Sequence, residues 1–381
     1  MLSIHIPEPL RGPKEYVFSC VTSAVNPYRF GVRLPDFEIP HDVLWDTVYP
    51  MFILSVLGGP LMGKHEQASV VFQYPIIPEV VQCLVDRAEK QGIALSVEAD
   101  NTTEPGDVPA LWDNVVGFGG GKESSLMCGL TRELGYSPRM LMGSPQAKKP
   151  RCRWPWPDVS FFQPQNRGII DRLVIQLMCG RTVYHGAGFG DTRLSVPWTQ
   201  YYAIGTQEGW DQLNDVFVSL GVDRRVLVPL QCVPFAQMPG ILCKRYPEVA
   251  ALRSSVDKKR PCEKNMHVSL CEMMNDVPFE DHCSREDLIM LIRKFIPICE
   301  DYGWRDGRML VRVEMCAMLY ALRDHEVLAP VRDEIDSSWK RDFIYKGHFY
   351  KACPPEFKEI LRQYLPEAPD GTDCPGGVWI Q

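Results

Sequence analysis

The sequence predicts an α/β protein whose core is a parallel sheet, with a strand-rich region before the core and a helical region after it. Strand-like and helix-like segments alternate across residues 109–255, which is typical of βαβ units. Before this stretch, short apolar runs are separated by turn residues, and after it apolar residues recur at helical spacing. We therefore expect three domains, at residues 1–108, 109–255 and 256–381.

The first of these regions contains runs rich in valine, phenylalanine and tyrosine, which predict strands. A helix is predicted at 79–92, where apolar residues share one face and Gly92 closes the pattern. A short strand follows at 94–97. The polar stretch 98–110 has no periodicity and contains two prolines, so we interpret it as a domain boundary. The strand-like runs are residues 15–25, 29–39 and 68–77.

The central region begins with a predicted βαβ unit. Residues 113–118 favour a strand, residues 122–135 a helix that ends at Gly135, and residues 139–143 a second strand. Two further pairs continue the alternation: a helix at 168–180 with a strand at 181–186, and a helix at 206–221 with a strand at 224–230.

The last region has the pattern of a group of helices. A helix at 284–303 starts with Ser284, and Asp287 follows three residues later, which is typical of a helix N-terminus. Further helices are predicted at 309–325 and 354–365.

The most apolar stretch of the whole chain lies in the first region, at 48–63. Prolines and glycines interrupt it and it is too short to cross a bilayer, so we expect a buried helix or strand with its turn.

Composition restricts the functional classes. The chain has 381 residues, 14 cysteines and a formal net charge of −7, and this mild acidity argues against a nucleic-acid partner. The first residues lack the basic start and apolar centre of a secretory signal. Scattered cysteines in a chain of this size are typical of reduced thiols. We therefore expect a cytoplasmic protein with no membrane partner.

A glycine-rich turn at the start of the predicted helix 122–135 is the most informative feature for function. Residues 114–125 read NVVGFGGGKESS, so Gly119, Gly120 and Gly121 stand between a strand and a helix. Backbone N–H groups at a helix N-terminus bind anions, and Lys122 adds a positive charge there. Ser124 and Ser125 add hydroxyl donors, which suits a phosphate or pyrophosphate. The alternative is a tight turn whose glycines only permit close packing.

Two common phosphate loops do not match this turn. The P-loop pattern requires a glycine where Val116 stands and a serine or threonine where Glu123 stands. The dinucleotide fingerprint requires a third glycine at the position of Lys122.

The turn instead resembles the pyrophosphate loop of the ATP pyrophosphatase superfamily, Ser-Gly-Gly-x-Asp-Ser. Residues 119–124 match this loop position for position, except that Gly119 replaces the serine and Glu123 replaces the aspartate. The resemblance implies a HUP-like nucleotide-binding core that uses ATP and Mg²⁺. It also implies that the glycines, Lys122, Ser124 and Ser125 hold the phosphates of ATP and that Glu123 is a ligand of Mg²⁺.

A second glycine cluster, TVYHGAGFGDTR at 182–193, follows another predicted strand. In folds that resemble this one, a later strand end closes over the nucleotide. Gly186, Gly188 and Gly190 would then let the backbone approach the ribose or adenine, and Asp191 would meet a hydroxyl group or a metal ion. A glycine-rich surface loop is the alternative.

Several features resemble one branch of the superfamily, the ATP-dependent UDP-N-acetylmuramoyl-L-alanyl-L-glutamate epimerases. The strand-rich region precedes the loop, and the segment 258–270 keeps Cys262 and Lys264. The resemblance implies that a small-molecule or peptide carboxylate is adenylated with release of pyrophosphate, and that a base then exchanges the proton on the adjacent carbon. Lys122 would act on the phosphates, and His185, Cys262 and His267 are the candidate bases.

Three alternatives remain open at this point. An amine or sulfur nucleophile could capture the adenylate, as in a ligase or thiolase. The chain could also bind nucleotides without catalysis. Finally, histidines and cysteines between 262 and 283 could hold a structural zinc, although they lack the usual close pairs. These residues are Cys262, His267, Cys271, His282 and Cys283.

Overall fold

The computed structural model describes a large part of the chain and divides it into two compact units. Unit 1 comprises Met1–Gly119, Gly135–Gly186 and Pro197–Val228, and unit 2 comprises Gly120–Leu134, Ala187–Val196 and Pro229–Gln381. These units are discontinuous in sequence, so the three continuous domains expected above stay a prediction. The described residues are 2–8, 10–12, 15–22, 28–33, 66–89, 92–100, 110–118, 121–143, 159–164, 176–177, 179–186, 207–233, 236–250, 262–278, 283–301, 309–339 and 354–364.

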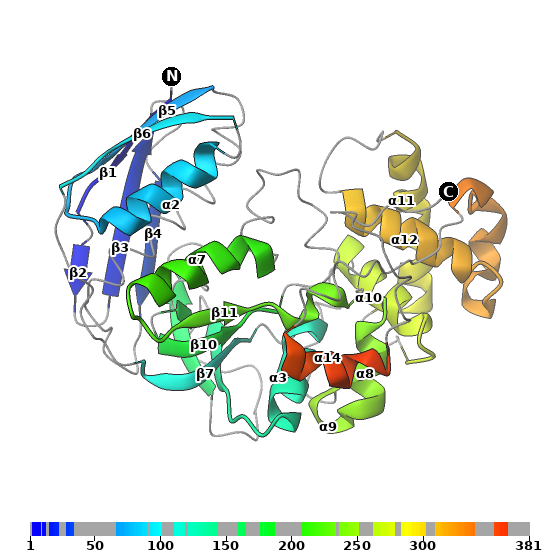
Figure 1. Cartoon of the computed structure of the whole chain (residues 1–381). Helices are drawn as coiled ribbons and strands as arrows, with labels where there is room; N and C mark the ends of the chain where they lie inside the picture. Colours follow the sequence, from blue (N-terminus) through cyan, green and yellow to red (C-terminus); the bar gives the residue numbers. More distant parts are fainter. Residues whose placement is uncertain are drawn as a thin grey trace, which may run out of the picture. The chain divides into compact units, whose positions relative to one another are not determined.

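The described strands of unit 1 form one 11-stranded sheet, and five of them make up its all-parallel half (Figure 1). The spatial order of these five is β11-β10-β7-β8-β9, and every neighbouring pair is parallel. Numbered along the chain, this is the doubly wound order 3-2-1-4-5, which reverses between β7 and β10. The strands are β7 (Trp112–Gly117), β8 (Arg139–Gly143), β9 (Val159–Pro164), β10 (Gly180–Tyr184) and β11 (Arg225–Leu227).

The other half of the sheet contains the N-terminal strands. Antiparallel pairing of β4 with β9, at Val32–Pro164 and Arg33–Gln163, joins it to the parallel half. The pairs β1–β5 and β5–β6 are parallel, and α2 (Pro78–Glu89) connects β5 to β6 and packs on β6. The strands are β1 (Leu2–Ile6), β2 (Leu10–Gly12), β3 (Glu15–Thr22), β4 (Tyr28–Arg33), β5 (Gln67–Phe72) and β6 (Ala94–Glu98).

Burial explains why each half takes its form. In β7 the consecutive residues Val115 and Val116 are both fully buried, as expected for a parallel strand covered on two faces. In β1 alternate residues are fully buried and the intervening ones are not, which is the period of a strand with one core face. The sheet is thus mixed, and the α/β class is confirmed.

Helix α7 (Gln207–Ser219) holds the edge strand β11 through two amide side chains. The Gln207 amide donates to the Val226 carbonyl at 3.0 Å and accepts from the Val228 N–H at 2.8 Å. The Asn214 amide bonds both backbone groups of Val226, at 3.0 and 2.8 Å. These bonds satisfy backbone groups that an edge strand leaves without a ladder partner.

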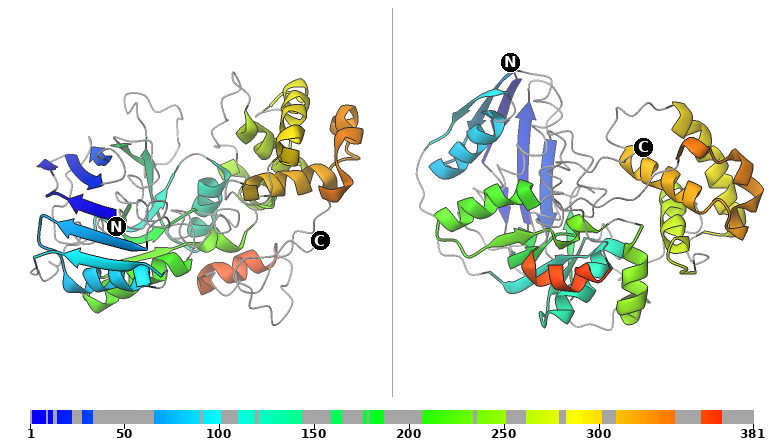
Figure 2. Two further views of the ribbon diagram at one scale, coloured as in Figure 1. Left: turned by 90° about the horizontal axis from the view of Figure 1, so that it is seen from above. Right: turned by 45° about the vertical axis from the view of Figure 1, so that its right-hand side comes forward.

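Unit 2 is helical in its described part. Helix α3 packs on α8 and α9, and α10 packs on α8, α11 and α12, with the last two shown in yellow and orange in Figure 2. The predicted N-terminus of α11 is confirmed: Ser284 Oγ accepts from the Asp287 N–H at 3.1 Å. The helices are α3 (Lys122–Glu133), η1 (Pro229–Cys232), α8 (Met238–Arg245), α9 (Pro247–Ala250), α10 (Glu263–Met273), α11 (Arg285–Asp301), α12 (Met309–Ala321), η2 (Glu326–Glu334), η3 (Ser337–Trp339) and α14 (Pro355–Arg362).

Two expectations concern the apolar segments. No helix in the described ranges is long and apolar enough to cross a membrane. The apolar run 48–63 lies outside the described residues, so its predicted buried helix or strand is not tested.

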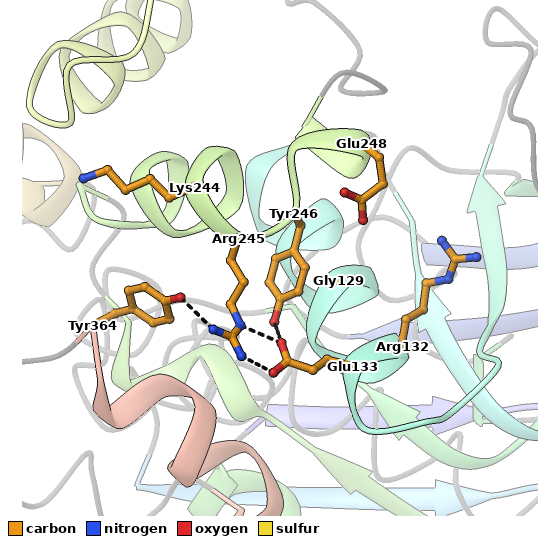
Figure 3. Close-up of a pocket in the computed structure, with 8 residues that line it drawn as sticks. All are labelled: Gly129, Arg132, Glu133, Lys244, Arg245, Tyr246, Glu248 and Tyr364. Atoms are coloured by element: carbon orange, nitrogen blue, oxygen red, sulfur yellow. Dashed lines mark hydrogen bonds and ion pairs between the residues drawn. The ribbon is translucent and has the colours of Figure 1, made fainter.

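A hydrogen-bond network joins three segments of unit 2 around the Glu133 carboxylate, which lies at the end of α3 (Figure 3). Arg245 binds it through two nitrogens, with a distance of 2.7 Å from Nε, and the Tyr246 hydroxyl donates to it at 2.5 Å. Arg245 Nη1 also donates to the Tyr364 hydroxyl at 3.0 Å. The hydrogen bonds from Arg245 hold the pKa of Glu133 below its ordinary value of 4.5. This group of residues is called the Glu133 network below.

The Glu133 network predicts a specific pH dependence of stability. Because the pKa of Glu133 is lower in the folded protein, its contribution is full above the unfolded pKa and disappears as the pH falls through the folded pKa. We expect Glu133→Gln to lower the free energy of unfolding by about 1 kcal/mol at pH 7, since the pair is partly exposed. Urea unfolding of both proteins should show this difference shrinking below about pH 4.5. A difference independent of pH would contradict the assignment.

Candidate functional site

Gly121, the last residue of the glycine-rich segment, leads directly into α3. Strand β7 ends at Gly117, and five residues later Lys122 begins the helix. Gly121 is the N-cap in an extended conformation, and a Cβ there would lie 2.9 Å from Glu123 Oε2. The absence of a side chain at Gly121 therefore leaves room for the Glu123 carboxylate. Gly119 and Gly120 lie outside the described residues.

The first turn of α3 buries polar side chains instead of exposing them. Lys122 and Ser124 are each 7% exposed, and Ser125 is fully buried. Ser124 Oγ donates to the Gly121 carbonyl at 3.3 Å. Ser125 Oγ has no hydrogen-bond partner among the described residues. Because a buried polar atom without a partner is costly, Ser125 is suited to bind a ligand or an ordered water.

Lys122 and Glu123 form a close ion pair. Lys122 Nζ lies 2.6 Å from Glu123 Oε1, and the Glu123 side chain remains 30% exposed. Burial acts to raise the pKa of Glu123, but the charge and hydrogen bond of Lys122 outweigh it and hold this pKa below 4.5. His267 lies close enough to lower the pKa of Glu123 further. Glu123 is thus a carboxylate at neutral pH, a form that can bind either Lys122 or a metal ion.

Two of the candidate bases lie on α10, in the same unit as α3. His267 is 6% exposed, and its effect on the pKa of Glu123 places it within electrostatic range of the first turn of α3. Cys262 is the exposed N-cap of α10, and its thiol donates to Asn265 Oδ1 at 3.0 Å.

The third candidate base lies in unit 1, at the end of β10. His185 is 9% exposed, and its backbone N–H donates to the Leu227 carbonyl at 2.8 Å. Its ring packs edge-on against Trp210, with 6.2 Å between the ring centroids. Strands β10 and β7 are parallel neighbours, with Tyr184 paired to Val116, so His185 and Gly186 follow the same sheet edge as Phe118. The strand order reverses here, and doubly wound sheets bind ligands at such a reversal. Gly188, Gly190 and Asp191 lie outside the described residues.

Two residues near these positions were not predicted. Trp210 supports the His185 ring from the first turn of α7. Gln176 packs against the end of β7, where a Cβ on Gly117 would lie 2.2 Å from its side-chain nitrogen. A side chain at Gly117 would therefore displace the Gln176 side chain. Neither contact has a local signal, because each joins segments far apart in the sequence.

The proposed zinc ligands do not gather in the described part of the chain. No three histidine, cysteine, aspartate or glutamate side chains approach one another there closely enough to hold a metal ion. Four of the five proposed ligands lie in the described part, and His282 lies outside it. The four are Cys262, His267, Cys271 and Cys283.

Together these features define a mixed α/β protein with a doubly wound parallel half-sheet and a polar helix N-terminus after its first strand. Comparisons with protein-family models, with curated proteins and with solved structures found no match.

Proposed function

We propose that this chain is an ATP-dependent enzyme of the pyrophosphate-loop type that adenylates a carboxylate, built on a HUP-like core. The first turn of α3 carries the proposal, because it combines Lys122 with two buried serine hydroxyls directly after a glycine turn. The N–H groups of such a turn bind phosphate, and the helix dipole favours negative charge. The strand order 3-2-1-4-5 supports a nucleotide site, since the first strand of this order leads into that turn.

The side chains fit a triphosphate in two respects. Ser125 offers a buried hydroxyl without a described partner. The Lys122 ammonium group is paired with the Glu123 carboxylate, and phosphate oxygens can take the place of that carboxylate. Glu123, and Asp191 from the second glycine cluster, would hold Mg²⁺, which commonly uses one or two carboxylates together with phosphates. The ion supplies charge stabilisation for the leaving pyrophosphate.

We assign epimerisation next to the activated carboxylate as the outcome, with a peptide or amino-acid-like carboxylate as substrate. Activation removes the negative charge of the carboxylate, so the proton on the adjacent carbon becomes more acidic. A histidine titrates near neutral pH and can remove and return such a proton. His267 is the preferred base, because it is buried in the same unit as α3 and lies within electrostatic range of Glu123 at the first turn of α3.

The test follows all products in one reaction. The protein is incubated with ATP, Mg²⁺ and candidate carboxylates in D₂O, and pyrophosphate, AMP and substrate deuterium are measured. Water hydrolyses the epimerised acyl adenylate to the carboxylate and AMP, so we expect AMP and pyrophosphate in equal amounts, with deuterium on the carbon next to the carboxylate. AMP with a new amide or thio product would replace epimerisation by ligation or thiolation. Bound ATP without turnover would contradict catalysis.

A further inference from the structure

A polar cavity lies at the C-terminal end of α3. It has a volume of about 650 Å³, within the usual range of small-molecule sites. Lys122 and Arg132 are ten residues apart on this helix, which corresponds to about 15 Å along its axis. The cavity is therefore separate from the first turn. It is lined by Gly129, Arg132, Glu133, Lys244, Arg245, Tyr246, Glu248 and Tyr364.

All residues of the Glu133 network line this cavity. Arg245 neutralises the Glu133 carboxylate, which also accepts from Tyr246, so Glu133 presents no uncompensated negative charge to a ligand. Tyr364 accepts a hydrogen bond from Arg245, and its own hydroxyl proton is left to donate. The network thus orients a hydroxyl donor beside the cavity.

Charges that the network does not use stand on the two sides of it. Lys244 and Tyr364 lie on one side of Arg245, and Glu248 and Arg132 lie on the other side of Tyr246 (Figure 3). Neither Lys244 nor Glu248 has an ion pair among the described residues. Within the described ranges, the lining thus holds an unpaired cation, Lys244, and an unpaired carboxylate, Glu248, in addition to the Arg245–Glu133 ion pair. This distribution favours a ligand with an anionic end and a cationic end.

We infer that this cavity binds a small zwitterion of the amino-acid class. The Lys244 ammonium and the Tyr364 hydroxyl hold its oxyanion, and the Glu248 carboxylate holds its ammonium group. Inorganic phosphate is also an oxyanion but has no ammonium group, so comparing it with the zwitterion tests the role of Glu248. The site does not involve the first turn of α3, so it is independent of ATP binding.

Calorimetric titration without ATP tests this site with L-glutamate, glutarate and inorganic phosphate as probes. We expect saturable binding of L-glutamate that is at least about 10-fold tighter than binding of either other probe, because only L-glutamate carries an ammonium group for Glu248. Lys244→Ala and Tyr364→Phe should each weaken it, by about 10-fold for the lysine. Glu248→Gln should weaken L-glutamate and leave glutarate unchanged.

The matched control is Lys294→Ala, which removes an exposed lysine from α11, outside the cavity, and should bind L-glutamate as the unaltered protein does. Thermal melting of each variant separates lost binding from lost folding. The inference is overturned if the unaltered protein binds none of the probes, or if folded Lys244→Ala binds L-glutamate normally. Equal affinity for all three probes would overturn the zwitterion assignment.

Discussion

Lys122→Ala is expected to lower ATP turnover by about 10²- to 10³-fold, which is the usual effect of removing one donor from a charge-stabilising site. The ammonium group is buried at the first turn of α3, 2.6 Å from Glu123. In the proposed reaction the Lys122 ammonium group leaves its ion pair with Glu123 and binds the phosphates. It then stabilises the negative charge that develops there as pyrophosphate leaves. Steady-state pyrophosphate release measures the effect.

Two further variants separate chemistry from folding. Lys122→Ala leaves the Glu123 carboxylate without its cation, which can destabilise unit 2 by itself. The double variant Lys122→Ala/Glu123→Gln removes this charge and should melt near the temperature of the unaltered protein while remaining inactive. Lys294→Ala, an exposed lysine on α11, is the control and should retain full turnover. Near-normal turnover in the double variant would refute the role of Lys122.

Phe357→Ala is expected to lower the free energy of unfolding of unit 2 by about 3–5 kcal/mol, as is typical of a deleted buried phenylalanine. Helix α14 has only eight residues, too few to be stable alone in water. Its stability must therefore come from its buried face. Phe357 and Leu361 on that face are fully buried, and Ile360 is nearly so. Urea unfolding followed by circular dichroism measures the change.

Glu359→Ala is the matched control on the same helix. Glu359 is exposed, and alanine preserves helix propensity, so the free energy of unfolding should change by less than about 0.5 kcal/mol. A loss equal to that of Phe357→Ala would show that the helix is held by its exposed face, contrary to the packing. A negligible effect of Phe357→Ala would show that α14 does not stabilise unit 2.

The elements that sequence predicted well have strong local signals. The βαβ unit agrees with β7, α3 and β8 within two residues at each end, because apolar periodicity and Gly135 mark it clearly. Gly135 has a φ of +82°, a conformation that glycine adopts at helix ends without strain. The N-terminus of α11 was also predicted from a local signal, because the side chain of Ser284 caps the helix by itself.

The features that sequence did not predict depend on distant pairing. Strand β9 lies in a segment rich in proline and tryptophan, and its pairing with β4 joins residues more than 100 positions apart. The Glu133 network has the same origin, since Glu133, Arg245 and Tyr364 look like ordinary surface residues in the sequence. Long-range contacts of this kind leave no local periodicity.

The candidate site shows both cases. The glycine turn and its lysine were recognised from local sequence, whereas the burial of Ser125 and the electrostatic effect of His267 on Glu123 required the fold. The glycines also differ in role. Gly117 accommodates Gln176, and Gly121 accommodates the Glu123 carboxylate. Only the second of these contacts belongs to the first turn of α3.

The most direct test of carboxylate adenylation is the exchange of labelled pyrophosphate into ATP. The protein is incubated with ATP, Mg²⁺, labelled pyrophosphate and a candidate carboxylate, and label in ATP is measured over time. We predict exchange that requires the carboxylate and that disappears in Lys122→Ala. ATP consumption that yields ADP and phosphate, with no label entering ATP for any carboxylate, would contradict the proposed function.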